Sequence, residues 1–130
     1  MILADTHVVL WLALEPLQIS PAAAKALTEA RLTGDGVAIA DITIWEIAQL
    51  TRKGRVELQT PLASFLGSVE SAYRVLGVTG EIATRGIGFA DSYPSDPADR
   101  LIGATAVVHG LRLVTKDAGI SASKEVDCIW

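Results

Sequence analysis

The sequence has little cysteine and no long apolar run. Its one cysteine, Cys128, excludes an internal disulfide. No uncharged apolar run approaches the roughly 20 residues that a helix needs to cross a bilayer. The apolar start of the chain is interrupted at Asp5, too early for a signal peptide. We therefore expect a cytoplasmic protein with no membrane segment.

Positive charge is also in deficit, with 11 Lys and Arg against 15 Asp and Glu and a net charge of −4. This balance excludes a global basic field of the kind that attracts nucleic acids to many proteins. An anionic substrate would have to be bound by a small local group of basic side chains.

Apolar residues, by contrast, make up 50% of the 130 residues. A chain of this length with 20% charged residues can bury enough apolar surface to offset the entropy of ordering. The sequence contains no internal repeat, low-complexity tract or linker, so we expect residues 1–130 to form a single domain.

Short apolar runs alternate with longer segments of helical periodicity. The expected strands are 2–4, 37–40, 73–78, 111–115 and 126–129. The expected helices are 8–14, 21–33, 41–53, 61–72, 79–87 and 97–109, with a loop at 88–95. Alternation of this kind is typical of an α/β fold whose parallel sheet is covered by helices on both faces.

Several helix ends are marked by capping residues. Ser20, Thr60 and Asp96 are each followed by proline, which predicts a helix that begins at that point. Gly54 and Gly110 follow helical segments and predict left-handed caps that end them.

Four acids stand at expected strand ends or helix starts. They are Asp5, Glu46, Asp99 and Asp117. The carboxyl ends of parallel strands meet at one edge of a sheet, so these residues are expected to lie together there. Carboxylates crowded in this way would repel one another unless a cation binds, and oxygen ligands suit Mg²⁺ or Mn²⁺. The sequence therefore predicts a metal site with the parts that a metal-dependent nuclease needs.

Each acid also has a structural interpretation. Asp5 could cap the first helix, and residues 43–46 fit a capping box. Residues 96–99 fit a variant of that box, and Asp117 could form an Asx turn. The joint placement of the four acids favours the metal site.

Four motifs occur in an order that resembles PIN-domain ribonucleases of the VapC toxin type. They are ADTHVVLW at 4–11, TIWEIA at 43–48, DPADRLI at 96–102 and LVTKD at 113–117. The resemblance implies a three-layer α/β/α fold with a central, mostly parallel sheet. It also implies Mg²⁺-dependent cleavage of RNA, a cognate antitoxin protein and a symmetric homodimer.

The resemblance implies a role for each acid. Asp5 and Asp99 would be direct metal ligands, and Glu46 and Asp117 would complete the site directly or through water. Thr115 would be a polar helper beside the metal. We therefore expect an endoribonuclease. Attack by a metal-activated water would leave 5′-phosphate and 3′-hydroxyl ends.

The chain departs from the family pattern at three places. Ala40 replaces a serine found in many relatives, and Asp41 either caps a helix or extends the acidic site. The segment 118–123 lacks the aromatic residue that often follows the last acid, which leaves the packing of this loop open.

Basic and aromatic residues near the motifs are candidates for binding. Arg100 and Lys116 could guide RNA phosphates, although Arg100 could instead hold a carboxylate. By resemblance, Trp11, Leu14 and Trp45 could bind the antitoxin. An exposed tryptophan could instead stack on a base, and a lone tryptophan more often packs in a core.

Other basic residues and both histidines are assigned lesser roles. The group of three at 52, 53 and 55 could also guide phosphates. For Arg52 and Lys53, solvated charge at a helix end is the favoured interpretation. His7 is assigned a supporting or structural role, and His109 is assigned to a helix end.

Two other functions are compatible with acids at the edge of a sheet. A receiver-like phosphoacceptor domain would need an acidic pair after the first strand and a lysine where Asp117 stands. A non-catalytic PIN-like scaffold that binds RNA or protein would have no need for four acids near a polyanion. The sequence therefore favours the nuclease.

Overall fold

Five short parallel strands form one sheet in the computed structural model, which describes residues 1–130. They are β1 (Ile2–Ala4), β2 (Val37–Ala40), β3 (Arg74–Leu76), β4 (Leu113–Val114) and β5 (Cys128–Ile129). Their order is β3-β2-β1-β4-β5, and every neighbouring pair is parallel. The predicted α/β fold with a mostly parallel sheet is confirmed.

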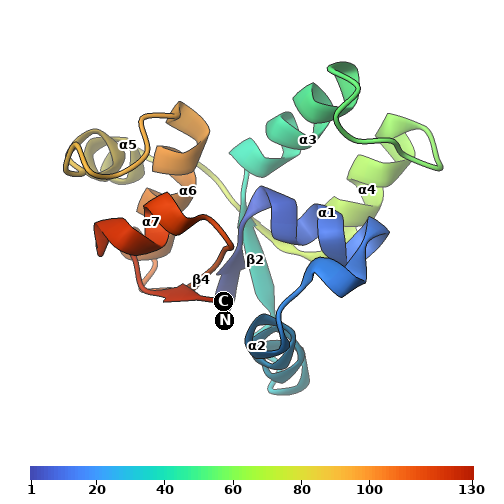
Figure 1. Ribbon diagram of the computed structural model, residues 1–130, viewed down its shortest axis with the longest axis horizontal. Coiled ribbons are helices and arrows are strands. Elements are labelled where there is room, and N and C mark those ends of the chain that lie inside the picture. The colour runs from blue at the N-terminus through green and yellow to red at the C-terminus, as the bar shows by residue number, and fades with distance from the viewer.

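Helices cover both faces of this sheet (Figure 1). One side carries α1 (Thr6–Leu14), α2 (Pro21–Leu32), α3 (Ile42–Arg52) and α4 (Leu62–Ala72). The other side carries α5 (Gly80–Ile87), α6 (Pro97–Val108) and α7 (Ala118–Ser123). A 3₁₀ turn, η1 (Pro16–Gln18), follows α1. The result is the three-layer α/β/α arrangement that the resemblance implies. No helix has both the length and the apolar character that spanning a membrane requires.

The strands supply side chains to a separate core on each face. In β2, Val37 and Ile39 pack with the helices α1 to α4, whereas Ala38 and Ala40 pack with α5 to α7. Both faces are buried, which is why this strand is a continuous apolar run rather than an alternating one. Full burial of a side chain such as that of Ile39 contributes about 1.5–3 kcal/mol.

Four of the five predicted capping residues stand where α2 and α6 begin and where α3 and α6 end: Ser20, Asp96, Gly54 and Gly110. Ser20 Oγ accepts a hydrogen bond from the Ala23 amide at 3.1 Å, and Asp96 Oδ1 accepts one from the Ala98 amide at 2.8 Å. Gly110 follows α6 with φ +64°, in the left-handed region that favours glycine. These signals are confirmed.

Other local predictions are corrected by the structure. Thr60 does not cap α4, because the helix begins one residue later with Pro61 at the N-cap and no side-chain bond. The expected strands at 73–78, 111–115 and 126–129 are shorter than predicted. The segment 118–123, which the sequence analysis treats as a loop, is helix α7, because Asp117 caps it through a bond to the Ile120 amide at 2.9 Å.

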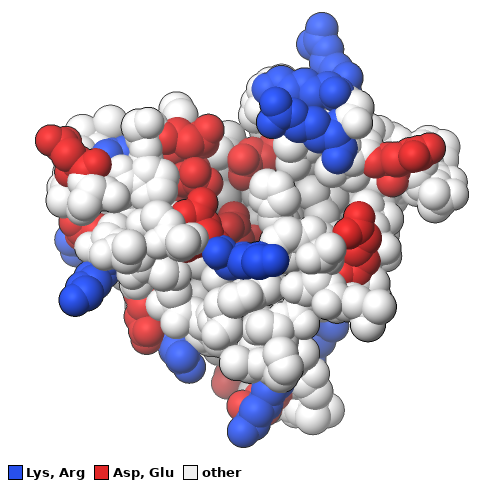
Figure 2. Space-filling view, viewed as in Figure 1, with Lys and Arg blue, Asp and Glu red and all other residues white.

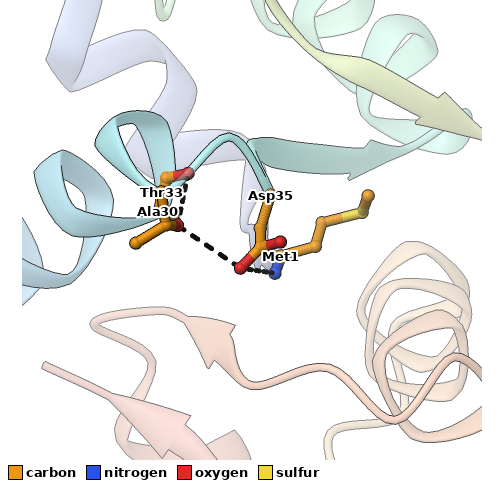
Figure 3. Close-up of polar contacts among 4 residues, drawn as sticks. All are labelled: Met1, Ala30, Thr33 and Asp35. Carbon is orange, nitrogen blue, oxygen red and sulfur yellow. Dashed lines mark hydrogen bonds and ion pairs between the residues drawn. The ribbon is translucent and has the colours of Figure 1, made fainter.

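Polar contacts join the start of the chain to the turn between α2 and β2 (Figure 3). The Thr33 hydroxyl lies 3.3 Å from the Ala30 carbonyl and 3.3 Å from Asp35 Oδ2. The same Asp35 oxygen lies 3.8 Å from the amino group of Met1. These groups precede β1 and β2, so they lie at the amino ends of the strands, opposite the edge where Asp5 stands.

Gly103 in α6 allows a close approach of Tyr93, and this contact predicts the effect of a substitution. A Cβ at Gly103 would overlap the buried ring and hydroxyl of Tyr93. We expect Gly103→Ala to lower the free energy of unfolding by about 1–3 kcal/mol, measured by urea denaturation. Gly67→Ala in α4 is the control because its Cβ meets open space, and it should be neutral or stabilising by up to about 1 kcal/mol. Equal losses in both variants would contradict the contact.

Candidate active site

Five carboxylates line an open crevice of about 510 Å³ at the carboxyl edge of the sheet. The four acids selected from the sequence are all there, together with one that was assigned only to capping: Asp5, Glu46, Asp96, Asp99 and Asp117. Figure 2 shows acidic side chains gathered in the middle of this face, between the α6 side and the α3 side. The tertiary structure thus brings together acids from four separate segments of the chain.

Asp5 and Thr115 meet across two neighbouring strands. The Thr115 hydroxyl donates to Asp5 Oδ2 at 2.7 Å, and the Thr6 amide donates to Asp5 Oδ1 at 2.8 Å. The strand order reverses here, because β1 continues to β2 and β3 on one side and borders β4 and β5 on the other. Ligand sites of open α/β sheets lie at such a reversal.

Glu46 is held by a buried threonine rather than by a capping box. The Thr6 hydroxyl donates to Glu46 Oε1, and the Thr43 hydroxyl oxygen lies 3.0 Å from that of Thr6. No side-chain bond caps α3, so the capping-box interpretation of residues 43–46 is wrong. Thr6 was not among the site residues predicted from the sequence, although its place directly after Asp5 was an available signal.

Two of the remaining acids, Asp96 and Asp117, each cap a helix and also line the crevice. Asp96 caps α6, and the amide of Asp99 in its first turn donates to Asp96 Oδ1 at 3.3 Å. Asp117 caps α7, as a local turn role predicts, and also lines the crevice. Asp41 does not line it, because its Oδ2 accepts from the Val78 amide at 3.1 Å.

Burial and the charges of neighbouring acids make three of these carboxylates, Asp5, Glu46 and Asp99, hard to ionise. Burial is the largest cause that raises the pKa of Asp99 to about 7, followed by the charges of Asp5, Asp96, Glu46 and Asp117. Burial also raises the pKa of Asp5 and of Glu46, against the hydrogen bonds that favour their ionised forms. The crevice is therefore electrostatically strained whenever all of its acids are charged.

Basic side chains lie at the rim of the crevice. Lys53, Arg55 and Lys116 line it, and Lys116 Nζ lies 5.6 Å from the centre of the Trp11 ring. Arg100 points elsewhere: its guanidinium donates to the carbonyls of Gly86 at 2.9 Å and Phe89 at 3.3 Å. The structure thus brings Lys116 to the acids but not Arg100.

The sequence matches the family model described as the PIN domain over residues 2–125. The chain belongs to the PIN domain family. It is 41% identical to Ribonuclease VapC22 of Mycobacterium tuberculosis over 116 residues, which cover 89% of this chain and 86% of that protein. The resemblance to VapC-type PIN proteins inferred from the four motifs is confirmed.

Two solved structures share the fold of this PIN domain. VapBC2 from Rickettsia felis, crystallised with a DNA fragment from its promoter, has a TM-score of 0.70 and 14% identity, covering 98% of this chain and 97% of that one. VapBC-1 from nontypeable Haemophilus influenzae has a TM-score of 0.69 and 16% identity, covering 98% and 96%. At such identities the likeness shows the fold alone.

A second groove of about 530 Å³ adjoins the acidic crevice of the PIN domain. Trp11 and Leu14 line it together with other apolar residues of α1 and of the end of α3, while Trp11 also lines the crevice. Trp45 lines neither and is 60% exposed on α3. Of the three residues considered for antitoxin binding, two therefore share one groove.

The donor set of this PIN domain fits a hard divalent cation. All of its acidic side chains are oxygen donors, as Mg²⁺ and Mn²⁺ prefer. The side chains do not form a preassembled group of three or more close ligands. They surround the crevice instead, which suits an ion that keeps several of its waters.

The raised pKa of Asp99 predicts that the PIN domain without metal loses stability as the pH rises from about 4 to about 7. In the unfolded chain the Asp99 carboxyl has its ordinary pKa of 3.8, whereas in the folded protein its pKa is raised to about 7. Between these values the unfolded state binds fewer protons, so rising pH favours unfolding.

Urea denaturation of wild type and Asp99→Asn from pH 4 to pH 8 measures this contribution. The unfolding free energy of wild type relative to that of the variant should fall from about pH 4 to about pH 7 and stay constant above pH 7. Mg²⁺ at pH 7.5 should raise the Tm of wild type more than that of the variant. A difference independent of pH would contradict the assigned shift.

Proposed function

We propose that this PIN domain is a Mg²⁺-dependent endoribonuclease and the toxin of a toxin–antitoxin pair. The observation that carries the proposal is the convergence of Asp5, Glu46, Asp99 and Asp117 on one crevice at the reversal of strand order. The relative Ribonuclease VapC22 supports the nuclease assignment through its name and its 41% identity.

Each residue has a role that follows from its place. Asp5 and Asp99 would bind the ion directly, and Glu46 and Asp117 would complete its surroundings directly or through water. Thr115 holds Asp5 through its hydroxyl. A bound Mg²⁺, or Mn²⁺ in its place, supplies the Lewis acidity that activates water and stabilises negative charge on a phosphodiester. Attack by water rather than by the RNA 2′-hydroxyl leaves 5′-phosphate and 3′-hydroxyl ends.

Basic side chains of the protein would position the RNA at the crevice. Lys116 is the cation best placed to bind an RNA phosphate, because it stands beside Asp117 at the rim and is held over Trp11. A local cation of this kind offsets the net charge of −4, which would otherwise repel RNA. Arg100 donates to the end of α5 and to the loop before α6 rather than to the site.

An antitoxin and a second copy of the chain are the proposed protein partners. The solved structures of similar fold include VapBC complexes, among them VapBC-5 of Mycobacterium tuberculosis, described as a member of a family of toxin–antitoxin systems. The groove that Trp11 and Leu14 line offers an apolar surface beside the crevice to which a cognate antitoxin could bind. A homodimer is proposed without assigned interface residues.

The proposed reaction predicts metal-dependent cuts with a defined end chemistry. Total bacterial RNA incubated with antitoxin-free protein and Mg²⁺ should show discrete cuts that carry 5′-phosphates, mapped by sequencing of the ends. EDTA should abolish the cuts. Asp99→Asn should reduce them by at least the roughly 10- to 100-fold that loss of a residue supporting a metal ligand costs, because this carboxylate would bind the ion directly. Asp91→Asn removes an exposed acid outside the crevice and should leave cleavage unchanged. Cyclic 2′,3′-phosphate ends would refute the mechanism, and intact RNA with folded, Mg²⁺-binding protein would favour a scaffold.

Lys116 and Arg100 are predicted to respond differently to removal of their charge. Lys116→Ala should weaken RNA binding and reduce the slope of log affinity against log salt by about 1, because one phosphate contact is lost. Arg100→Ala should leave that slope unchanged and lower the Tm, because it removes two hydrogen bonds to backbone carbonyls. Fluorescence anisotropy with labelled RNA and EDTA present measures both slopes. The reverse pattern would assign the phosphate contact to Arg100.

A further inference from the structure

Two buried threonines lie between α1 and α3, next to the acids but not among them. Thr6 is 1% exposed and Thr43 is fully buried. Their hydroxyl oxygens are 3.0 Å apart, and that of Thr6 also contacts Glu46 Oε1. These contacts form a short chain of hydrogen bonds that leads from the interior of the protein to the crevice.

The direction of this chain follows from the number of protons. A threonine hydroxyl has one proton to donate, and an ionised carboxylate can only accept. Thr6 therefore donates to Glu46, which leaves Thr43 as the donor to Thr6. The Thr6 hydroxyl has one orientation that satisfies both neighbours, so it is fixed rather than free to rotate.

Thr6 also contacts a second acid, Asp5. Its backbone amide donates to Asp5 Oδ1 at 2.8 Å while its hydroxyl donates to Glu46. The amide position is set by the first turn of α1, and the β-branched side chain restricts χ1. One rigid residue thus links the carboxylate that follows β1 to the carboxylate that α3 carries.

We propose that Thr6 is a positioning residue that holds the Glu46 carboxylate in the crevice, in place for a divalent cation, and that Thr43 orients the Thr6 hydroxyl. The proposal rests on the proposed function for the identity of the ligand. Without the hydroxyl, the flexible Glu46 side chain has no other bond in the structure to keep it directed at the other acids. Thr6 acts through Glu46 and touches neither substrate nor metal.

Thr6→Val tests this role because valine keeps the shape of the side chain and the amide bond to Asp5. We expect the variant to bind Mn²⁺ roughly 10- to 100-fold more weakly than wild type by isothermal titration calorimetry. Thr6→Ser restores the hydroxyl and should restore the affinity to within a few-fold. If wild-type protein binds Mn²⁺ and Thr6→Val binds it with the same affinity, the proposal is overturned.

Thr105→Val is the matched control for loss of a buried hydroxyl. Thr105 is fully buried in α6 and donates to the Leu101 carbonyl at 2.7 Å, away from the crevice. We expect this control to lower the Tm without a change in Mn²⁺ affinity. An equal loss of affinity in both variants would show a general effect on the fold and would overturn a specific role for Thr6.

A double-mutant cycle and a crystal structure complete the test. In a Glu46→Gln background, Thr6→Val should cause no further loss of Mn²⁺ affinity, whereas an additive loss would show that Thr6 acts by another route. In crystals of metal-free Thr6→Val, the Glu46 side chain should leave its wild-type rotamer, and an unmoved Glu46 would overturn the proposal. This last readout is independent of catalysis, so failure of the nuclease assignment would appear separately as wild-type protein that neither binds Mn²⁺ nor cuts RNA.

Discussion

The candidate active site depends on holding several negative charges close together in a partly buried crevice. The parallel sheet provides this because its order reverses between β1 and β4, so that residues after each strand meet at one edge. The bond from Thr115 to Asp5 closes that junction at 2.7 Å, and the backbone adds another from the Asp5 amide to the Val114 carbonyl at 3.0 Å. The raised pKa of Asp99 shows the electrostatic cost of the arrangement, which a bound cation would relieve.

Structural and chemical roles coincide in these acids rather than compete. Asp5, Asp96 and Asp117 each cap a helix with one carboxylate and still line the crevice. The amino ends of α1, α6 and α7 therefore point at the acids, and backbone amides there donate to these carboxylates and stabilise their negative charge. The same geometry that begins a helix thus helps to keep carboxylates at the site.

The layers around the site support it from both faces of the sheet. Tyr93 donates to the Asp99 carbonyl at 2.6 Å through the space that Gly103 leaves, which holds the first turn of α6 in place. On the other side, Trp11 packs against His7 and Trp130 and carries Lys116 over its ring. Because Trp11 lines both the crevice and the second groove, a protein bound in that groove would contact a wall of the candidate active site.

The sequence by itself determined the alternation of strands and helices, most of the caps and the four acids at strand ends and helix starts, since these depend on local periodicity and on neighbouring residues. It could not determine that Thr6 reaches Glu46 across 40 positions, that Arg100 turns away from the acids, or that residues 43–46 form no capping box. Those outcomes depend on which helices pack side by side, and a side chain with several possible partners chooses among them only once the sheet has brought them within reach. Helix α7 was missed for a related reason: a six-residue segment has little helical preference of its own, and a cap from Asp117 and the burial of Ile120 decide its conformation.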